Sequence, residues 1–152
     1  MERILVSHCL LGQRCRYNGG HCRNQAVIDL EKNFCLVPIC PEVMGGLGIP
    51  RTLTKIQPDG RTVDKNGVDK TANLHLGIQI SLDIAGKNNC KVAVLHPECQ
   101  LCAADGKVID GIFTGKLSSS EYGKKADLLH QHGIQIYFPN ETENVLKFFG
   151  CS

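Results

Sequence analysis

Residues 34–51 read FCLVPICPEVMGGLGIPR, and this stretch decides the fold that the sequence predicts. Its first six residues, 34–39, are apolar and stop at the turn signal formed by Cys40 and Pro41, which indicates a short buried strand rather than a helix. A thiol, on Cys40, and a carboxylate, on Glu42, follow at the exit of that strand. Because ligands of open α/β sheets bind beyond the carboxyl ends of the strands, we expect a reaction site here.

Two other apolar runs lead into cysteines in the same way. Residues 4–7 lead into Cys9, and residues 92–95 lead into Cys99. If the three runs form parallel strands, their carboxyl ends meet at one edge of the sheet. The sequence therefore predicts that Cys9, Cys40 and Cys99 converge.

The rest of the chain alternates predicted strands with predicted helices. Strands are expected at residues 4–7, 34–39, 91–95 and 134–138, and helices at 24–32, 69–85 or 71–85, 120–130 and 140–149. Residues 52–66 are expected to form a hairpin or a lid, and residues 106–115 a small hairpin or a strand-turn excursion. This alternation predicts the α/β class, as a single three-layer Rossmann-like domain over residues 1–152 with a mostly parallel sheet.

Capping residues and periodicity define the predicted helices. Asn24 is expected to cap the first helix, Gly86 to end the second, and Asn140 or Thr142 to cap the last. The second helix has apolar residues at helical spacing, which predicts one buried face. That face comprises Leu74, Ile78, Leu82 and Ala85.

Composition and charge narrow the function classes. The chain has 152 residues, of which 42% are hydrophobic and 21% charged, with a formal net charge of +2. These values are typical of a globular domain, and no basic run indicates binding to a membrane or nucleic acid, although tRNA remains compatible. No apolar stretch is long enough to span a bilayer and no signal-peptide pattern is visible, so we expect a cytoplasmic protein.

Nine cysteines are many for a chain of this length. An α/β pattern without a secretion signal favours a reducing compartment, where thiols bind metals or take part in catalysis instead of forming structural disulfides. Cys35, Cys90 and Cys151 are interpreted as small buried hydrophobic residues. The roles of Cys15, Cys22 and Cys102 stay open.

Three separated cysteines suit an iron-sulfur cluster better than a closed zinc site, which prefers four ligands in paired C-x-x-C motifs. A [4Fe-4S] cluster held by three thiolates leaves one iron free to act as a soft Lewis acid on substrate sulfur. Glu42 could serve as the general base, or only as a salt-bridge partner or helix cap. His8 and His96 stand beside predicted ligands, where an imidazole can ligate a metal, transfer protons or simply satisfy a hydrogen bond.

The motifs resemble those of the small bacterial family that contains the thiouracil desulfidases. The resemblance covers nearly the whole chain, and its most specific part is CPEV-x-GGL at residues 40–47. The matching segments are VSHCLLG at 6–12, RYNG at 16–19, PICPEVMGGL at 38–47, PR at 50–51, GVDKT at 67–71, HPEC at 96–99, DGIFTG at 110–115, ADLL at 126–129 and GIQI at 133–136.

The resemblance implies a [4Fe-4S] cluster bound by Cys9, Cys40 and Cys99. Family enzymes remove sulfur from thiolated uracil compounds, with relatives acting on thiouridine in nucleotides or tRNA. The implied substrate is a thiolated pyrimidine base or nucleotide whose thiocarbonyl sulfur is captured by the open iron. Water activated by Glu42 would attack the ring carbon, and His96 is the second implied catalytic residue.

The chain departs from the family pattern in three of its motifs. His8 stands where the family usually has alanine, and Asn18 stands where it has aspartate. His96 begins the third motif, HPECQ, where the family reads SPSCG, so a histidine replaces a serine that is a candidate catalytic group in the family. This histidine can take over proton donation or ligate the metal, and the exact substrate stays open.

Substrate contacts are expected from side chains and glycine backbone around the three strand exits, because glycine lets a ligand approach the backbone closely. The candidate substrate-binding residues are Ser7, Arg16, Tyr17, Gly45, Gly46, Arg51 and Asp69.

Two other function classes remain compatible with the residues. A non-catalytic metal-binding or sulfide-carrier protein would close the metal coordination with His8, His96 or Cys102. A thiol redox protein would use Cys99 and Cys102, which form a C-x-x-C pair.

Overall fold

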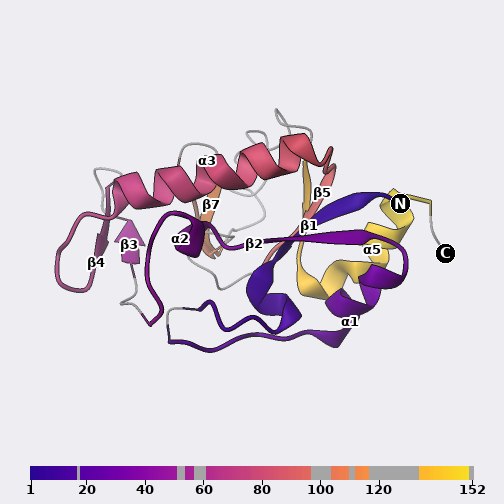
Figure 1. Ribbon diagram of the computed structural model, residues 1–152, viewed down its shortest axis with the longest axis horizontal. Coiled ribbons are helices and arrows are strands. Elements are labelled where there is room, and N and C mark those ends of the chain that lie inside the picture. Colours follow the sequence, from indigo (N-terminus) through magenta and orange to yellow (C-terminus); the bar gives the residue numbers. More distant parts are fainter. Residues whose placement is uncertain are drawn as a thin grey trace.

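The computed structural model describes residues 1–16, 18–50, 54–56, 61–96, 104–109, 112–116 and 134–150. Four strands form the main sheet in the order β2-β1-β5-β8, and every neighbouring pair is parallel. These strands are β1 (Arg3–Ser7), β2 (Cys35–Ile39), β5 (Val92–Val94) and β8 (Gln135–Tyr137). The parallel sheet expected from the alternating pattern is confirmed (Figure 1).

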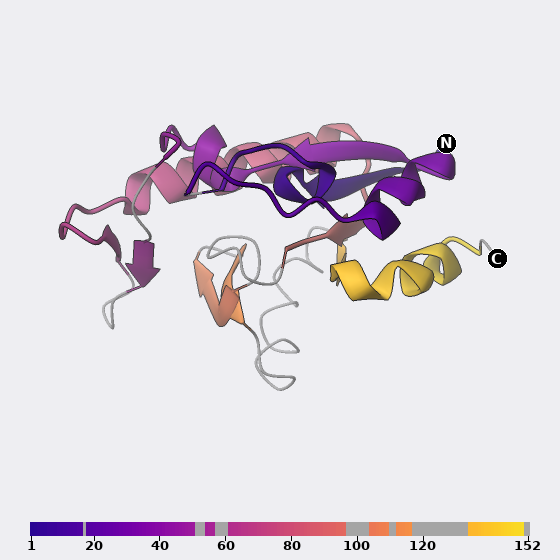
Figure 2. The same cartoon turned by 90° about the horizontal axis from the view of Figure 1, so that it is seen from below.

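Helices cover both faces of this sheet. The long helix α3 (Thr71–Lys87) packs on one face, and α1 (Gln25–Ile28), the 3-10 helix η2 (Asp29–Lys32) and α5 (Thr142–Phe148) pack on the other. In Figure 1, α3 lies above the strands and α5 lies below them, and in the view of Figure 2, α3 runs behind the strands. The predicted three-layer α/β arrangement is therefore confirmed.

Alternating side chains of the strands build two separate cores. Leu5 is paired with Val37 and Ala93, and all three pack in the core beneath α3. Val6 is paired with Val94, and both pack in the core beneath α1 and α5. Because β1 is central and buried on both faces, it can be apolar at every interior position, which is typical of parallel sheets.

Strand β2 lies at the edge of the sheet, so the expectation of a fully buried strand is wrong. Cys35 and Pro38 are exposed, whereas Ile39 is 5% exposed. Proline has no N–H to donate and is tolerated on an edge strand. Because Cys35 lies on this edge strand and is exposed, its interpretation as a buried residue is wrong. The interpretation of Cys90 as buried is confirmed, since it is 5% exposed. Cys151 lies outside the described residues.

The first helix has the predicted cap but a shorter α-helical part. The side-chain oxygen of Asn24 accepts a hydrogen bond from the backbone N–H of Val27 at 3.1 Å. Only residues 25–28 are α-helical, and the remaining turn is the 3-10 helix η2. The buried Val27 and Leu30 still lie on the side that faces the sheet.

The second predicted helix ends later than expected. Gly86 lies inside α3, and Asn88 is the C-cap. The side-chain amide of Asn88 donates to the carbonyl oxygen of Ile84 at 2.8 Å, and Asn89 adopts the left-handed conformation with φ 52°. Asparagine is the residue that most readily replaces glycine in that conformation, so Gly86 is not needed to end the helix.

The buried face of α3 carries small residues. Gly77, Ser81 and Ala85 are buried at intervals of four residues, and Leu82 is half-buried. The side chains of Leu74 and Ile78, expected on this face, lie outside the described part of the chain. The small residues allow the short helix α2 (Pro41–Met44) to pack directly on α3.

Two glycines make this contact between α2 and α3 possible. A Cβ on Gly77 would overlap the carbonyl oxygen of Pro41, and a Cβ on Gly45 would overlap that of Asn73. The side-chain amide of Asn73 also donates to the carbonyl oxygen of Gly45 at 2.9 Å. The backbone of α2 and the residue after it are therefore held against α3.

Gly77→Ala is expected to destabilise the protein, because the added methyl group meets backbone that cannot move aside. Overpacking of this kind costs about 1–3 kcal/mol, and each kcal/mol lowers Tm by about 2–4 °C in a chain of this size. Gly86→Ala is the matched control on the same helix, since nothing lies within 4 Å of its Cβ. That change should raise the stability by up to about 1 kcal/mol, and thermal unfolding followed by circular dichroism separates the two. Equal effects of the two substitutions would contradict the close contact.

Two hairpins lie outside the main sheet, as expected. Strands β3 (Thr54–Ile56) and β4 (Thr62–Asp64) pair antiparallel, and so do β6 (Ala104–Ile109) and β7 (Ile112–Lys116). The helix expected at residues 120–130 lies outside the described residues.

The last helix is preceded by the 3-10 helix η3 (Pro139–Glu141). The N-cap of α5 is Glu141, and not Asn140 or Thr142 as predicted. The carboxylate of Glu141 accepts a hydrogen bond from the backbone N–H of Phe138 at 3.0 Å. Among the helices in the described part of the chain, none combines the length and the apolar character that crossing a bilayer requires.

Candidate active site

The carboxyl ends of three adjacent strands define the candidate site. Ser7 at the end of β1 pairs with Ile39 at the end of β2, so Cys9 and Cys40 follow paired positions. β5 lies on the other side of β1 and leads to His96. The three strand exits that the sequence singled out are therefore neighbours at one edge of the sheet.

Cys9 lies in the 3-10 helix η1 (His8–Leu11) that follows β1, and it is 6% exposed. Its carbonyl oxygen accepts from the N–H groups of Gly12 at 3.2 Å and Cys22 at 2.9 Å. The second bond folds the polar loop of residues 12–24 back over the end of β1. Cys9 is thus held between the sheet and this loop.

Cys40 is the N-cap of α2, and its side chain makes no capping bond. Its thiol donates to the carbonyl oxygen of Cys15 at 3.9 Å. A hydrogen bond with the Cys15 side chain, and then burial, raise the pKa of the Cys40 thiol above its usual range. Because metals bind the thiolate, loading a metal on Cys40 must release a proton.

Glu42 lies in the first turn of α2, two residues after Cys40, and is 9% exposed. Pro41 occupies the first position of that helix, where its missing N–H costs nothing. A carboxylate is favoured near a helix N-terminus, because the partial charge there is positive. The contact between α2 and α3 fixes the backbone that carries Glu42.

Ser7 and His96 connect the ends of β1 and β5. The Ser7 hydroxyl oxygen accepts from the backbone N–H of His96 at 3.0 Å. Both residues are buried, Ser7 at 1% and His96 at 7% exposed. The backbone of His96 is therefore held at the strand exits by a bond to the Ser7 side chain that the sequence did not reveal.

His8 is half-buried at the start of η1. Burial lowers the pKa of its imidazole, which favours the neutral form. A neutral imidazole can accept a proton or bind a metal.

Arg16, a predicted substrate contact, lies in the polar loop over the site. Its guanidinium donates to the sulfur of Cys22 at 3.2 Å. The loop is closed by the N–H of Arg16, which donates to the carbonyl oxygen of Gly20 at 3.2 Å. Tyr17 and Arg51, two other predicted contacts, lie outside the described residues.

Gly45 has a packing role, since the close backbone approach expected there is made by α3. Gly46 has a positive φ of 88° and lies beside the Asn73 side chain. Asp69 is exposed, and its carboxylate accepts from the N–H of Thr71 at the start of α3 at 2.8 Å. No described contact brings Asp69 to the strand exits.

The donor set at the strand exits is compatible with an iron-sulfur cluster. The described thiols of Cys9 and Cys40 supply the soft sulfur ligands that such clusters prefer. The third predicted ligand, Cys99, lies outside the described residues. Among the residues that are described, no group of three His, Cys, Asp or Glu side chains is arranged to hold a metal ion.

Sequence reasoning left the roles of Cys15 and Cys22 open and missed Asn73. Cys15 lies against Cys40, Cys22 bonds Arg16, and Asn73 holds the backbone of Gly45. Neither cysteine directly follows a predicted strand, so no sequence pattern marked it as part of the site. Asn73 had no signal, because its role depends on how α3 packs.

Comparisons with known proteins agree with this architecture. A family model described as 2-thiouracil desulfurase matches residues 4–141. YbbK of Bacillus subtilis (strain 168), described as an uncharacterised protein, is 31% identical over 152 residues, which covers 94% of this chain and 99% of the relative. Among solved structures, the [4Fe-4S]-dependent thiouracil desulfidase TudS is similar with a TM-score of 0.73 and 28% identity, over 98% of each chain.

Proposed function

Because the chain belongs to the 2-thiouracil desulfurase family, we propose that it is a [4Fe-4S]-dependent desulfidase that replaces the thiocarbonyl sulfur of a thiolated pyrimidine with oxygen. One observation of the structure carries the proposal. Thiols on Cys9 and Cys40 follow the ends of adjacent parallel strands, and the buried carboxylate of Glu42 lies two residues after Cys40.

Cys9, Cys40 and Cys99 would hold the cluster. A cluster bound there would supply a soft Lewis acid for the thiocarbonyl sulfur. Water supplies the oxygen, and the sulfur leaves as sulfide. The chain must therefore position the ring, activate a water molecule and supply protons.

Glu42 is the proposed general base. The residue is 9% exposed, so it is largely shielded from bulk solvent. A carboxylate oxygen accepts a proton from the attacking water and makes that water a better nucleophile. Because the helix carrying Glu42 is fixed against α3, the carboxylate is positioned without a large conformational change.

Ser7 and His96 are proposed to contact the substrate on the other side of the site. The Ser7 oxygen accepts from His96, so its own hydroxyl proton can be donated to a carbonyl or ring nitrogen. The imidazole of His96 can give a proton to the departing group.

The direct test uses protein purified and reconstituted without oxygen. Iron and acid-labile sulfide should reach the stoichiometry of one [4Fe-4S] cluster, and the protein should convert 2-thiouracil to uracil with release of sulfide. A chelator that strips the iron should stop the reaction. A stable cluster without turnover of thiolated bases or nucleotides would contradict the enzyme and favour the sulfide-carrier alternative.

A cytoplasmic location and a single domain over residues 1–152 stay predictions from the sequence.

A further inference from the structure

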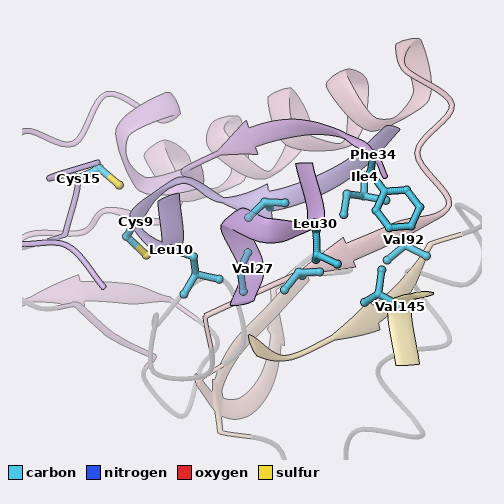
Figure 3. Close-up of a cluster of buried hydrophobic side chains, with 11 residues drawn as sticks. Ile4, Cys9, Leu10, Cys15, Val27, Leu30, Phe34, Val92 and Val145 are labelled. Carbon is cyan, nitrogen blue, oxygen red and sulfur yellow. The ribbon is translucent and has the colours of Figure 1, made fainter. Parts of the chain in front are cut away.

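Cys15 is a buried thiol that the desulfidase reaction does not use. It lies in the loop between η1 and α1 and is 4% exposed. It belongs to the same hydrophobic cluster as Cys9, and Figure 3 shows the two at one end of that cluster, with Phe34 and Val145 at the other. A buried thiol therefore lies in the same cluster as Cys9, a predicted ligand of the iron-sulfur cluster.

Cys15 is in direct contact with Cys40, although 25 residues separate them in the chain. The Cys40 sulfur lies 3.9 Å from the carbonyl oxygen of Cys15. A disulfide forms only between cysteines that the backbone already brings together. The contact of the Cys40 sulfur with the Cys15 backbone brings these two cysteines together.

The loop that carries Cys15 is held in place by its own backbone bonds. The N–H of Cys15 donates to the carbonyl oxygen of Gln13 at 2.9 Å, and the N–H of Cys22 donates to that of Cys9. On the other side, Cys40 is fixed at the start of α2. The two segments that carry Cys15 and Cys40 are therefore each held by hydrogen bonds and lie in contact with one another.

We propose that Cys15 and Cys40 form a reversible disulfide in the cluster-free protein, and that this bond blocks cluster loading by removing Cys40 as a ligand. The block of cluster loading rests on the proposed function, whereas the formation of the disulfide does not. The disulfide is a redox switch: the protein is competent for the cluster only when this pair is reduced.

The oxidant is a peroxide, and the chemistry balances. One cysteine sulfur attacks a peroxide oxygen, the O–O bond breaks, and a sulfenic acid and one water molecule form. The second sulfur then displaces the sulfenic oxygen as another water molecule and closes the S–S bond. Hydrogen peroxide gains the two electrons that the two thiols lose, and a dithiol reverses the step by exchange.

The test maps disulfides in metal-free protein treated with hydrogen peroxide, blocked with iodoacetamide and digested with trypsin. Cleavage after arginine and lysine places Cys15 in residues 15–16 and Cys40 in residues 33–51, whereas Cys9 and Cys22 fall in residues 4–14 and 17–23. Mass spectrometry should find residues 15–16 joined to residues 33–51. A link to either of the other two peptides instead would overturn the proposal.

Two variants make the assignment specific. Residues 33–51 also contain Cys35, at the opposite end of β2 from Cys40. Cys35→Ser should keep the cross-link, and Cys15→Ser should lose it. Loss of the link in Cys35→Ser, or its persistence in Cys15→Ser, would refute the pairing.

The effect on cluster loading is measured separately. Oxidised wild-type protein should take up less than about a tenth of the iron of the reduced protein, and dithiothreitol should restore uptake. Cys15→Ser treated with the same peroxide and then dithiothreitol serves as the reference for irreversible damage. A cross-link that leaves iron uptake unchanged would refute the block, and with it the ligand role of Cys40, while leaving the disulfide itself established.

Discussion

Cys40→Ser is expected to abolish the cluster and with it all desulfidase activity, while the fold stays intact. A [4Fe-4S] cluster held by three thiolates cannot tolerate the loss of one of them without losing most of its affinity. Cys40 is also the N-cap of α2, where its side chain makes no capping bond. Serine is a preferred N-cap residue, so the metal-free variant should unfold at the same temperature as the wild type or higher.

Three measurements check this expectation: iron content, acid-labile sulfide and the visible absorbance of the reconstituted protein. Cys35→Ser is the matched control, because Cys35 lies in β2 but is exposed at the other end. It should keep the full cluster. A Cys40→Ser protein with wild-type iron content, or a Cys35→Ser protein without iron, would rule out the assignment.

Glu42→Gln is expected to lower kcat by about 10²- to 10⁴-fold, the usual contribution of a general base, with the cluster retained. Glutamine has nearly the same size and can occupy the same buried position in α2, but it cannot accept a proton from water at neutral pH. The loss should therefore appear in kcat and not in iron content or thermal stability.

Glu143→Gln provides the control for the removal of one negative charge. Glu143 is exposed in the first turn of α5, so its replacement should leave kcat and cluster content unchanged. If Glu42→Gln also lost the cluster, Glu42 would have to be placed among the groups that support the metal. An unchanged kcat would remove it from catalysis altogether.

The sheet could be predicted from the sequence because its signals are local. The apolar runs at β1 and β5 are buried on both faces, and residues in such strands do not need alternating polarity. The same apolar runs also mark where each strand ends. Cys9, Cys40 and His96 could therefore be placed at one edge of the sheet before the fold was known.

Features that depend on distant packing could not be predicted. The edge position of β2 follows from the order of strands, and nothing within CLVPI except Pro38 indicates it. The face of α3 carries Gly77 and Ser81 because α2 presses against it, which a search for large apolar residues overlooks. The contact of Cys15 with Cys40 has the same origin, since a loop brings the two together.

The hydrogen bond from His96 to Ser7 has a consequence for the order of events in the cell. It joins residues 89 positions apart, and such a contact can form only after β5 has been synthesised and has docked beside β1. The site is thus incomplete on the ribosome until β5 has emerged. Because Cys99 is the third proposed ligand, a cluster on Cys9, Cys40 and Cys99 could be completed only once the chain has been synthesised past residue 99.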